Sequence, residues 1–367
     1  MRRVVADIDA SALAHNLAIV RALAADSRVL AVVKADAYGH DLVPTARTLA
    51  SAGADGFGVA CVEEALALRE SGIRERIVVL EGVTASSELV AARNAGLELV
   101  VHADWQLAML ERDGVRGLCR LWIKFNTGMN RLGFPMEVSE TVRSRFDALG
   151  ASSVLMSHLA CADEPEREEN ARQLQAFENL RTAFPGAASL ANSAAVLTLP
   201  AAHYDWVRPG LLLYGVSPLP DCDAAALGLC PAMTLKARIL AVQDVAAGAG
   251  VGYGEDWRAP LASRVAIASI GYGDGYPWRG AQGASALVHG RRVPLVGRVS
   301  MDMLGLDVTA IAGVAPGDEV VLWGKGLSVE EVARAAGTIP YELVCDVTRR
   351  VPRVYSEASE PADAAVA

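Results

Sequence analysis

A lysine closes an apolar run near the start of the chain, at a position where a charged side chain is costly to bury. Residues 28–41 read RVLAVVKADAYGHD, so Lys34 ends a predicted strand and Tyr38 and His40 follow it closely. A lysine amine can form a Schiff base with an aldehyde, which an arginine, always protonated, cannot do. Only four of the 34 basic residues are lysines, and a lysine at this position therefore favours amine chemistry.

Other apolar runs in the N-terminal half also end on polar side chains. Lys124 lies at the end of CRLWIKF, His158 ends SSVLMSH, Asn192 and Ser193 follow ASLA, and Arg208 lies in WVRPGLLLYG. In a (β/α)8 barrel, the side chains that do chemistry lie where the parallel strands end, at the carboxyl rim. Together with the strand of the lysine, five predicted strands would deliver polar groups to one rim.

The order of the predicted elements favours such a barrel. From about residue 11 to about residue 230, helical patterns alternate with eight short apolar runs, which is the rhythm of a (β/α)8 barrel of the TIM type. A doubly wound open sheet is the alternative that this pattern leaves open. Beyond residue 231, strands with glycine-rich turns follow, interrupted by one short helix, SVEEVARAAG. We predict an α/β barrel domain over 1–230 and a mostly-β domain over 231–367. The pattern leaves open whether the first strand of the chain belongs to the second domain.

Composition limits the class of protein. A chain of 367 residues, of which 52% are hydrophobic, has enough apolar side chains for two cores. No apolar run approaches the roughly 18 to 20 residues of a membrane span, and the N-terminus lacks the apolar core of a signal peptide, so we expect a cytoplasmic protein without a membrane partner. The six cysteines lack metal-ligand spacing, and a net charge of −9 argues against a nucleic-acid partner.

The predicted rim suits pyridoxal phosphate. This cofactor is an aldehyde that a lysine can bind, and its phosphate requires backbone N–H groups and hydroxyls from small-residue loops after the late strands. The segments ANSAA and RPGLL stand in such positions, although ANSAA on its own is typical of a helix N-cap. The sequence therefore predicts a pyridoxal-phosphate site built on Lys34.

Segments along the whole chain resemble those of the alanine racemase family. AVVKADAYGHD matches the family's cofactor-lysine motif, and further matches follow in the family's order. They are IKFNTGMNRLGF, MSHLACADE, ANSAA, RPGLLLYG, GVGYGEDW, IGYGDGYPW, GRVSMDM and YELVCDVTRRVPRVY. The resemblance implies a pyridoxal-phosphate enzyme, built as a barrel plus a β-domain, that interconverts L-alanine and D-alanine. That reaction would supply D-alanine for bacterial cell-wall peptidoglycan or serve its catabolism.

The resemblance also implies roles for individual residues. Lys34 is implied to be the Schiff-base lysine and one catalytic base, and Tyr253 the second base. The implied cofactor contacts are Tyr38, His158, Asn192, Ser193, Arg208, Gly210, Leu211 and Tyr341. Arg131 and the backbone of Met301 are implied to hold the substrate carboxylate. Tyr272 is implied to line the entrance, and Asp302 to support the site from the β-domain.

The implied chemistry is a two-base proton transfer at Cα of the pyridoxal-phosphate aldimine, which bases on opposite faces serve best. Family members supply the tyrosine from the second subunit, which implies a head-to-tail homodimer with shared active sites. Arg208 is implied to contact the pyridine nitrogen, with His158 bonded behind it; a nitrogen facing a permanent cation stays unprotonated, which limits side reactions such as transamination. The lysine that matches Lys124 is often carbamylated in the family, which the sequence leaves open here.

Two departures from the family pattern occur. Asn126 stands where many relatives have aspartate, which removes no catalytic group, and Trp278 precedes Arg279 where many have the arginine first, which leaves its role near the entrance open. A related barrel decarboxylase and a non-catalytic cofactor-binding protein are the alternative functions; RPGLL, GVGYG and the second domain argue against them. The preference for alanine over serine is also open, because small pockets reject one added hydroxyl only weakly.

Overall fold

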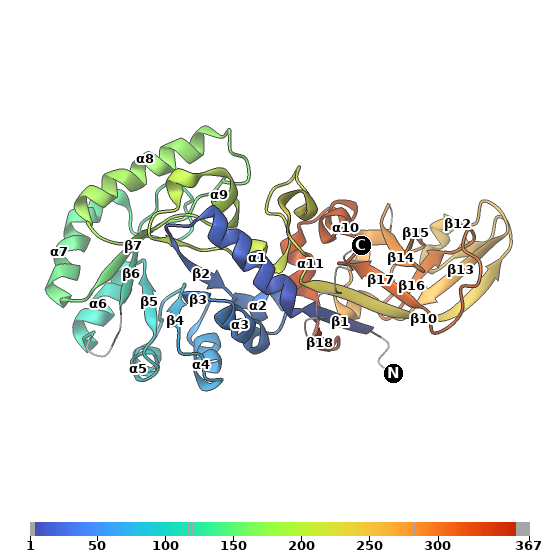
Figure 1. The fold of residues 1–367 in the computed structure, drawn as a ribbon, viewed down its shortest axis with the longest axis horizontal. Coiled ribbons are helices and arrows are strands. Elements are labelled where there is room, and N and C mark those ends of the chain that lie inside the picture. The colour runs from blue at the N-terminus through green and yellow to red at the C-terminus, as the bar shows by residue number, and fades with distance from the viewer. Residues whose placement is uncertain (1–3, 116–117, 119, 282, 357–367) are drawn as a thin grey trace, which may run out of the picture.

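A computed structural model describes residues 4–115, 118, 120–281 and 283–356 of the chain. In Figure 1 two bodies lie side by side along the long axis: a barrel of strands and helices, and an elongated β-domain. Within these ranges, no helix has both the length and the apolar character that a membrane crossing requires.

Eight parallel strands form the sheet of the first body among the described residues. In spatial order they are β8 (Ala188–Ser189), β7 (Ser153–Met156), β6 (Leu121–Lys124), β5 (Glu98–Val101), β4 (Arg76–Val79), β3 (Gly56–Val59), β2 (Arg28–Val32) and β9 (Trp206–Val207). Backbone hydrogen bonds from Asp205 to Ala188 (3.2 Å) and from Arg208 to Ala191 (2.9 Å) join the two outermost strands. The predicted (β/α)8 barrel is therefore confirmed as a nearly closed barrel, and the open sheet is excluded.

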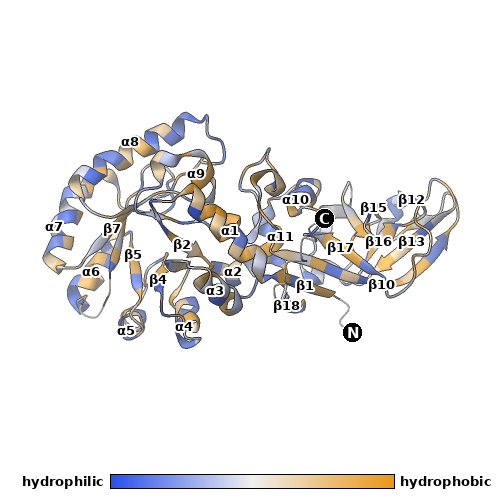
Figure 2. Cartoon of the chain, in the orientation of Figure 1, coloured by the Kyte–Doolittle hydropathy of each residue, from blue (hydrophilic) through white to orange (hydrophobic). Residues whose placement is uncertain are grey.

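Helices surround the barrel strands. They are α1 (Ala10–Leu23), α3 (Leu42–Ser51), α4 (Val62–Glu70), α5 (Ser86–Asn94), α6 (Asp104–Asp113), α7 (Ser139–Leu149), α8 (Glu168–Ala183) and α9 (Ser193–Thr198). Helix α1 begins after Asp9, whose carboxylate accepts two N–H groups of the first turn, and it buries Leu13, Leu17 and Val20 at helical spacing. Figure 2 shows α1 as mostly hydrophobic and the peripheral α8 as largely hydrophilic.

A separate cluster of apolar side chains fills the barrel. Its members come from alternate positions of the strands: Leu30, Val78, Val100, Trp122, Val154, Met156 and Trp206. The two tryptophan rings meet edge to face with centroids 5.7 Å apart, and the indole N–H of Trp122 donates to the buried carboxylate of Glu98 at 2.7 Å. The interior below the carboxyl rim is thus solid, which gives the rim a rigid floor.

The β-domain is built on a second eight-stranded sheet. Its order is β13 (Ser263–Ala268), β16 (Leu304–Asp307), β15 (Arg291–Val296), β14 (Ser285–Val288), β17 (Glu319–Trp323), β10 (Met233–Val245), β1 (Val4–Asp9) and β18 (Arg353–Ser356). The long strand β10 also pairs with β13, so the sheet curls back on itself. A separate hairpin of β11 (Gly250–Val251) and β12 (Trp257–Arg258) lies at the end of the domain farthest from the barrel (Figure 1).

The first strand of the chain lies in the β-domain, although the next element, α1, packs on the barrel. Strand β1 pairs antiparallel with β10 and parallel with β18. Lys236 forms an ion pair with Asp7, and Lys325 forms one with Asp9, both at 2.7 Å. Because Asp9 also caps α1, one carboxylate connects the β-domain to the first helix of the barrel.

The prediction of a single helix in the C-terminal half is wrong. The structure has α10 (Val329–Ala336) at the predicted place and a second helix, α11 (Pro340–Asp346). A proline suits the first turn of α11, and Leu343 and Val344 are its buried residues. Its seven residues make only about two turns, which is too short for a 3.6-residue period to show in the sequence.

Gly215 fixes the chain just beyond the barrel. Its φ is +71°, and a Cβ atom there would lie 1.7 Å from the carbonyl oxygen of Cys230. We expect Gly215→Ala to lower the free energy of unfolding by more than about 2 kcal/mol, because an overpacked backbone contact adds to the left-handed strain. Urea titration of the unfolding transition measures this loss.

Gly228→Ala is the matched control. Gly228 has the same φ of +71°, but its Cβ would meet only Ile19 Cδ1, at 3.8 Å. This variant should lose only about 1 kcal/mol, from backbone strain alone. Equal losses in the two variants would show that the contact with Cys230 costs nothing.

Candidate active site

Four cationic side chains gather at the carboxyl rim of the barrel. Lys34 follows β2, Lys124 ends β6, Arg131 lies on the loop after β6, and Arg208 follows β9. Burial, followed by the charges of Arg208, Arg131 and Lys34, lowers the pKa of Lys124 to about 8. Within the described ranges, none of the four forms an ion pair with an acidic residue. The rim therefore carries positive charge that the chain itself leaves uncompensated.

Strand geometry explains why these groups meet. Side chains alternate along a strand, so a residue two or four positions beyond an inward-facing one extends from the same side of the strand. The structure repeats this relation on three strands, from a residue of the barrel interior to a polar residue at the rim. The pairs are Trp122 and Lys124, Met156 and His158, and Trp206 and Arg208, whereas Lys34 reaches the rim at the start of the turn that follows β2. The predicted meeting of polar groups at one rim follows directly from this alternation.

Arg208 is held by neutral acceptors only. Its side chain is 4% exposed and donates to the hydroxyl of Ser189 and to the carbonyl oxygens of Ser157 at 2.7 Å and Leu190 at 3.1 Å. Burial lowers the pKa of Arg208 to about 9. The guanidinium is thus fixed in direction while its charge stays free to act on a ligand.

His158 lies against the same guanidinium. Arg208 Nη2 is 3.3 Å from His158 Nδ1, and because a guanidinium only donates, this nitrogen accepts. Burial and then the charges of Arg208 and Lys124 hold the pKa of His158 well below its ordinary value. A neutral imidazole in this position, with its one proton on Nε2, orients Arg208 and does not take up a second proton near neutral pH.

A left-handed turn follows the rim lysine. The segment α2 (Lys34–Gly39) holds residues 35–38 at φ values of 53° to 54°. Left-handed backbone costs non-glycine residues about 1 to 2 kcal/mol each, so this turn needs strong local support. The carboxylate of Asp36 accepts the N–H of Leu42 at 2.9 Å, and that of Glu64 accepts the N–H of Ala35 at 2.8 Å. No pattern in the sequence predicted this turn.

Small residues after β8 and β9 form a cradle of backbone groups and hydroxyls. Asn192 caps α9 by accepting the N–H of Ala195 at 3.0 Å. The hydroxyl of Ser193 accepts the N–H of Gly210 at 2.8 Å. A Cβ at Gly210 would lie 2.4 Å from the hydroxyl of Tyr38, so only glycine leaves room there. This is the shape and chemistry that a small anionic group requires.

Three tyrosines line up beside this cradle. The ring of Tyr38 stacks on that of Tyr214, with centroids 4.9 Å apart. The ring centroid of Tyr341, on α11, lies 6.1 Å from that of Tyr38. Leu211 begins the 3-10 turn that carries Tyr214 and is fully buried. The predicted cofactor residues of the barrel and Tyr341 are therefore close to one another.

The remaining predicted residues lie in the β-domain. Tyr253 is 72% exposed and stands between β11 and β12, at the end of the molecule opposite β2 (Figure 1). Tyr272 and Met301 are also exposed, and Asp302 is bonded to Arg350 at 2.6 Å. One chain alone thus does not bring the predicted second base to Lys34.

Sequence reasoning missed the residues that hold the others in place. The hydroxyl of Ser189 and the backbone carbonyl of Ser157 orient Arg208, and the ring of Tyr214 supports Tyr38. The one available signal was a small hydroxyl residue near the end of an otherwise apolar strand, and it is weak.

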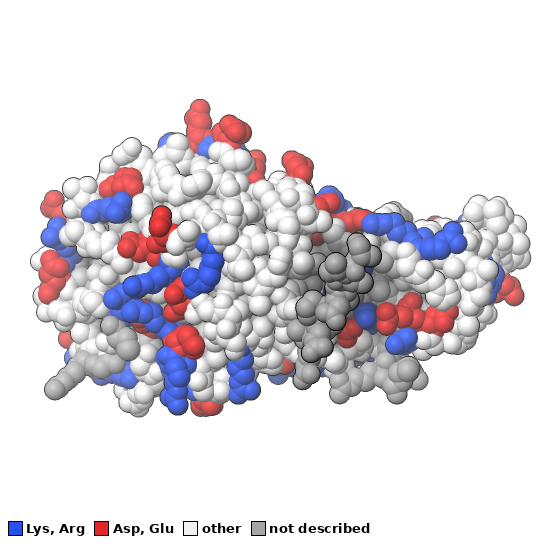
Figure 3. Space-filling model, in the orientation of Figure 1, with Lys and Arg blue, Asp and Glu red and all other residues white. Residues whose placement is uncertain are grey.

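The charge on the outer surface is mixed. On the face drawn in Figure 3, acidic and basic side chains alternate over both domains. In the described part of the chain, no three His, Cys, Asp or Glu side chains are grouped so that they could hold a metal ion.

The comparisons with known proteins all identify the same family. Residues 8–218 match the family model described as "Alanine racemase, N-terminal domain", and residues 232–355 match "Alanine racemase, C-terminal domain". The chain is 50% identical over 350 residues to the alanine racemase of Nitrosococcus oceani, an alignment that covers 94% of this chain and 97% of the relative.

Solved structures give the same result. The biosynthetic alanine racemase of Pseudomonas aeruginosa superposes with a TM-score of 0.94 at 45% identity, covering 97% of this chain and 100% of that one. An alanine racemase from Bartonella henselae, described with covalently bound pyridoxal phosphate, superposes with a TM-score of 0.87 at 28% identity, covering 97% and 100%.

The lowered pKa of Lys124 has a measurable consequence. Only a neutral amine adds to carbon dioxide, and the neutral fraction of Lys124 rises as pH passes through about 8. With a fixed concentration of ¹³C-bicarbonate, we expect a carbamate ¹³C NMR signal that increases between pH 7 and pH 9. The signal should vanish in Lys124→Met.

Lys236→Met is the matched control. Although partial burial acts against it, bonds to Asp7 and Glu319 raise the pKa of Lys236, which stays protonated in this pH range. The control should keep the full signal. A carbamate signal that survives Lys124→Met would place the modification on another amine.

Proposed function

The chain belongs to the alanine racemase family, and from this membership we propose how its residues divide the work of interconverting L-alanine and D-alanine. The observation that carries the proposal is the set of unpaired cations around Lys34 at the barrel rim. These charges suit an anionic cofactor and the carboxylate of an amino acid, both of which arrive with negative charge.

The residues present fit pyridoxal phosphate. Gly210 leaves a space that a Cβ would fill, Ser193 and backbone N–H groups surround it, and Tyr38 closes it. We assign the phosphate to this cradle, together with Leu211 and Tyr341, and the pyridine nitrogen to Arg208, with His158 and Asn192 in support. When bound through Lys34, the cofactor withdraws electrons from the substrate and makes its Cα proton acidic.

Arg208 sets the strength of that electron withdrawal. A guanidinium has no acceptor and keeps its proton, so Arg208 would donate to a pyridine nitrogen placed beside it and would leave that nitrogen unprotonated. The neutral partners of Arg208 support this role, because a carboxylate beside it would neutralise the charge facing the ring. By limiting electron withdrawal, Arg208 would favour return of the proton to Cα over transamination.

Lys34 and Tyr253 are proposed to exchange protons with opposite faces of Cα. Tyr253 belongs to the β-domain and is exposed far from β2 of its own chain, which supports its supply from a second subunit. The protein would then be a head-to-tail homodimer with two shared active sites. Arg131 and the backbone of Met301 would hold the substrate carboxylate.

Two further residues of the β-domain are assigned to the entrance. Tyr272 is exposed and would line the path of the substrate, and Asp302, held by Arg350, would support the site from the same domain. We place the reaction in the cytoplasm, where D-alanine would be supplied for peptidoglycan. Catabolism of D-alanine is the alternative use of the same chemistry.

Chiral analysis of the product tests the proposed reaction. The purified holoenzyme should convert L-alanine into an equal mixture of both enantiomers, and L-serine more slowly. Lys34→Ala is the control and should form no D-alanine. Release of carbon dioxide without a change of enantiomer would indicate a decarboxylase and contradict the proposal.

Mixed dimers test the shared site. Lys34→Ala and Tyr253→Phe should each lose a factor of about 10² to 10⁴ or more in rate, since each removes a general base. A purified heterodimer of these two chains should recover activity, because one of its sites then carries both lesions and the other carries none.

The reverse pairing is the control. A heterodimer of the Lys34→Ala/Tyr253→Phe double variant with the natural chain has one lesion in each shared site and should be inactive. If Lys34 and Tyr253 of one chain worked together, the activities of the two heterodimers would be exchanged, and the shared site would be excluded.

A further inference from the structure

Strand β18, at the edge of the β-domain sheet, contacts the turn that follows the rim lysine. Its burial alternates, so that Arg353 and Tyr355 are partly buried while the residues between and after them are exposed. Residues two positions apart extend from the same side of a strand. Both side chains donate to the end of the turn: Nε of Arg353 to the carbonyl oxygen of Gly39 at 2.9 Å, and the hydroxyl of Tyr355 to that of His40 at 2.8 Å. A strand of the β-domain therefore binds two successive carbonyl groups of the barrel rim.

The guanidinium of Arg353 joins this turn to a second segment. It also donates to the carbonyl oxygens of Thr348 and Val351, both at 2.7 Å, and to that of Val347, all in the loop between α11 and β18. Its planar fork of five N–H groups reaches four acceptors, whereas a lysine ammonium has three donors on a single nitrogen. Arginine is therefore required for the complete set of bonds.

The loop held by Arg353 is itself firmly attached to the β-domain. The N–H of Thr348 donates to the carbonyl oxygen of Asp274 at 3.0 Å, and its hydroxyl donates to that of Gly273 at 3.1 Å. A Cβ at Gly275 would lie 2.1 Å from the carbonyl oxygen of Asp346, so the two segments pack closely. Arg353 thus ties the turn at the rim to a well-supported part of the other domain.

The carbonyl group that Arg353 binds comes directly after Tyr38. Tyr38 has a φ of +53°, which is strained for a bulky residue. A Cβ at Gly39 would lie 2.0 Å from the carbonyl oxygen of Val344, so the turn also packs closely on α11. Bonds at Gly39 and His40 fix the peptide groups that follow Tyr38, and with them the direction of its ring.

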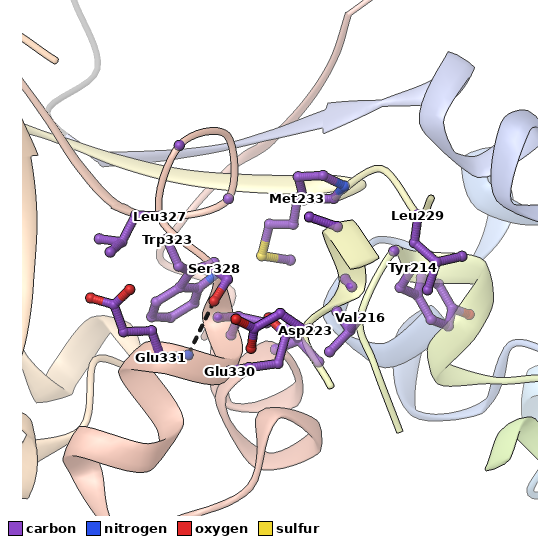
Figure 4. A pocket seen from close by; sticks show the side chains of 18 of the residues that line it. Tyr214, Val216, Asp223, Leu229, Met233, Trp323, Leu327, Ser328, Glu330 and Glu331 are labelled. Atoms are coloured by element: carbon purple, nitrogen blue, oxygen red, sulfur yellow. Dashed lines mark hydrogen bonds between the residues drawn. The ribbon is translucent and has the colours of Figure 1, made fainter. Parts of the chain in front are cut away.

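Ring packing alone gives Tyr38 incomplete support. Its ring stacks on that of Tyr214, but a cavity of about 300 Å³ lies beside Tyr214, between the two domains. Figure 4 shows Tyr214 on one side of this cavity and Trp323, of β17, on the other. Side chains next to a void have fewer packing contacts. The position of Tyr38 therefore depends also on the hydrogen bonds from β18.

We propose that Arg353 is a positioning residue that keeps the hydroxyl of Tyr38 at the phosphate cradle. The inference rests on the proposed function, which assigns the cofactor phosphate to this cradle. Arg353 acts through the turn, because its four bonds all go to backbone oxygens. Tyr355 holds the next carbonyl group with a single donor and makes a smaller contribution of the same kind.

A comparison of pyridoxal phosphate with pyridoxal tests this role. Pyridoxal has the same aldehyde and ring but no phosphate, so its affinity does not depend on the hydroxyl of Tyr38. In equilibrium dialysis of the full chain, Arg353→Lys should weaken pyridoxal phosphate about tenfold, as expected for the loss of one hydrogen bond to a charged group, and leave pyridoxal unchanged. Tyr355→Phe should weaken pyridoxal phosphate about threefold. Equal losses for the two ligands would overturn the inference.

A double-mutant cycle separates positioning from a general loss of structure. Tyr38→Phe alone should weaken pyridoxal phosphate about tenfold, and adding Arg353→Lys should cause no further loss, because both changes act on one hydroxyl. Additive losses would show that Arg353 acts independently of Tyr38 and would contradict the proposal.

Arg69→Lys is the control for the loss of an arginine that binds backbone oxygens. Arg69, in the last turn of α4, also donates to four carbonyl groups, but at the end of the barrel opposite the rim; they belong to Ile73, Glu75, Ala95 and Gly96. This variant should keep the natural affinity for pyridoxal phosphate. A loss equal to that of Arg353→Lys would reduce the effect to destabilisation and exclude a positioning role.

Amide hydrogen exchange supplies a readout that needs no cofactor. In the full chain without pyridoxal phosphate, residues 35–42 should exchange faster in Arg353→Lys than in Arg69→Lys, because the turn has lost its support. Unchanged exchange and unchanged affinity in Arg353→Lys, with a natural chain that binds pyridoxal phosphate, would overturn this inference alone. A natural chain that does not bind pyridoxal phosphate would contradict the proposed function, and this inference with it.

Discussion

The positive charge held at the barrel rim is the constraint on which the rest of the structure depends. Lys34, Lys124, Arg131 and Arg208 stand together without an acidic partner in the described chain, and burial, followed by the charges of the other three, lowers the pKa of Lys124. Like charges in a partly desolvated place repel one another strongly. Anions that enter the rim relieve the repulsion, so affinity for a phosphate and for a carboxylate follows from the electrostatics of the protein alone.

A rim of this kind needs a rigid support. The tryptophans of the barrel interior fill the space below it, and the neutral acceptors around Arg208 fix the guanidinium without cancelling its charge. On the other side of Lys34, a left-handed turn stores strain that the bonds of Asp36 and Glu64 counteract. Both supports hold the cations and N–H groups of the rim in place before any ligand binds.

The sequence was informative where the end of a strand dictates position. The ends of the apolar runs predicted Lys34, Lys124 and Arg208 at one rim, and the order of elements predicted the barrel. It was uninformative where a short segment depends on tertiary contacts, as α11 does, or where backbone strain is imposed by neighbours, as in the turn up to Tyr38. If Tyr253 acts at the barrel of a second chain, the residues that it meets depend on the assembly, and the pattern of one chain cannot predict them.

The division of the proposed site between two domains gives the junction an unusual importance. If Tyr253 serves the barrel of a second chain, its distance from that chain's Lys34 depends on the angle between barrel and β-domain within each subunit. Contacts that join the two domains lie far from the chemistry, among them Asp9 between Lys325 and α1 and the close packing of Gly215 on Cys230. A misplacement of about 1 Å between reacting groups can cost about 10² in rate. Small changes at the junction would therefore act on proton transfer without touching the substrate.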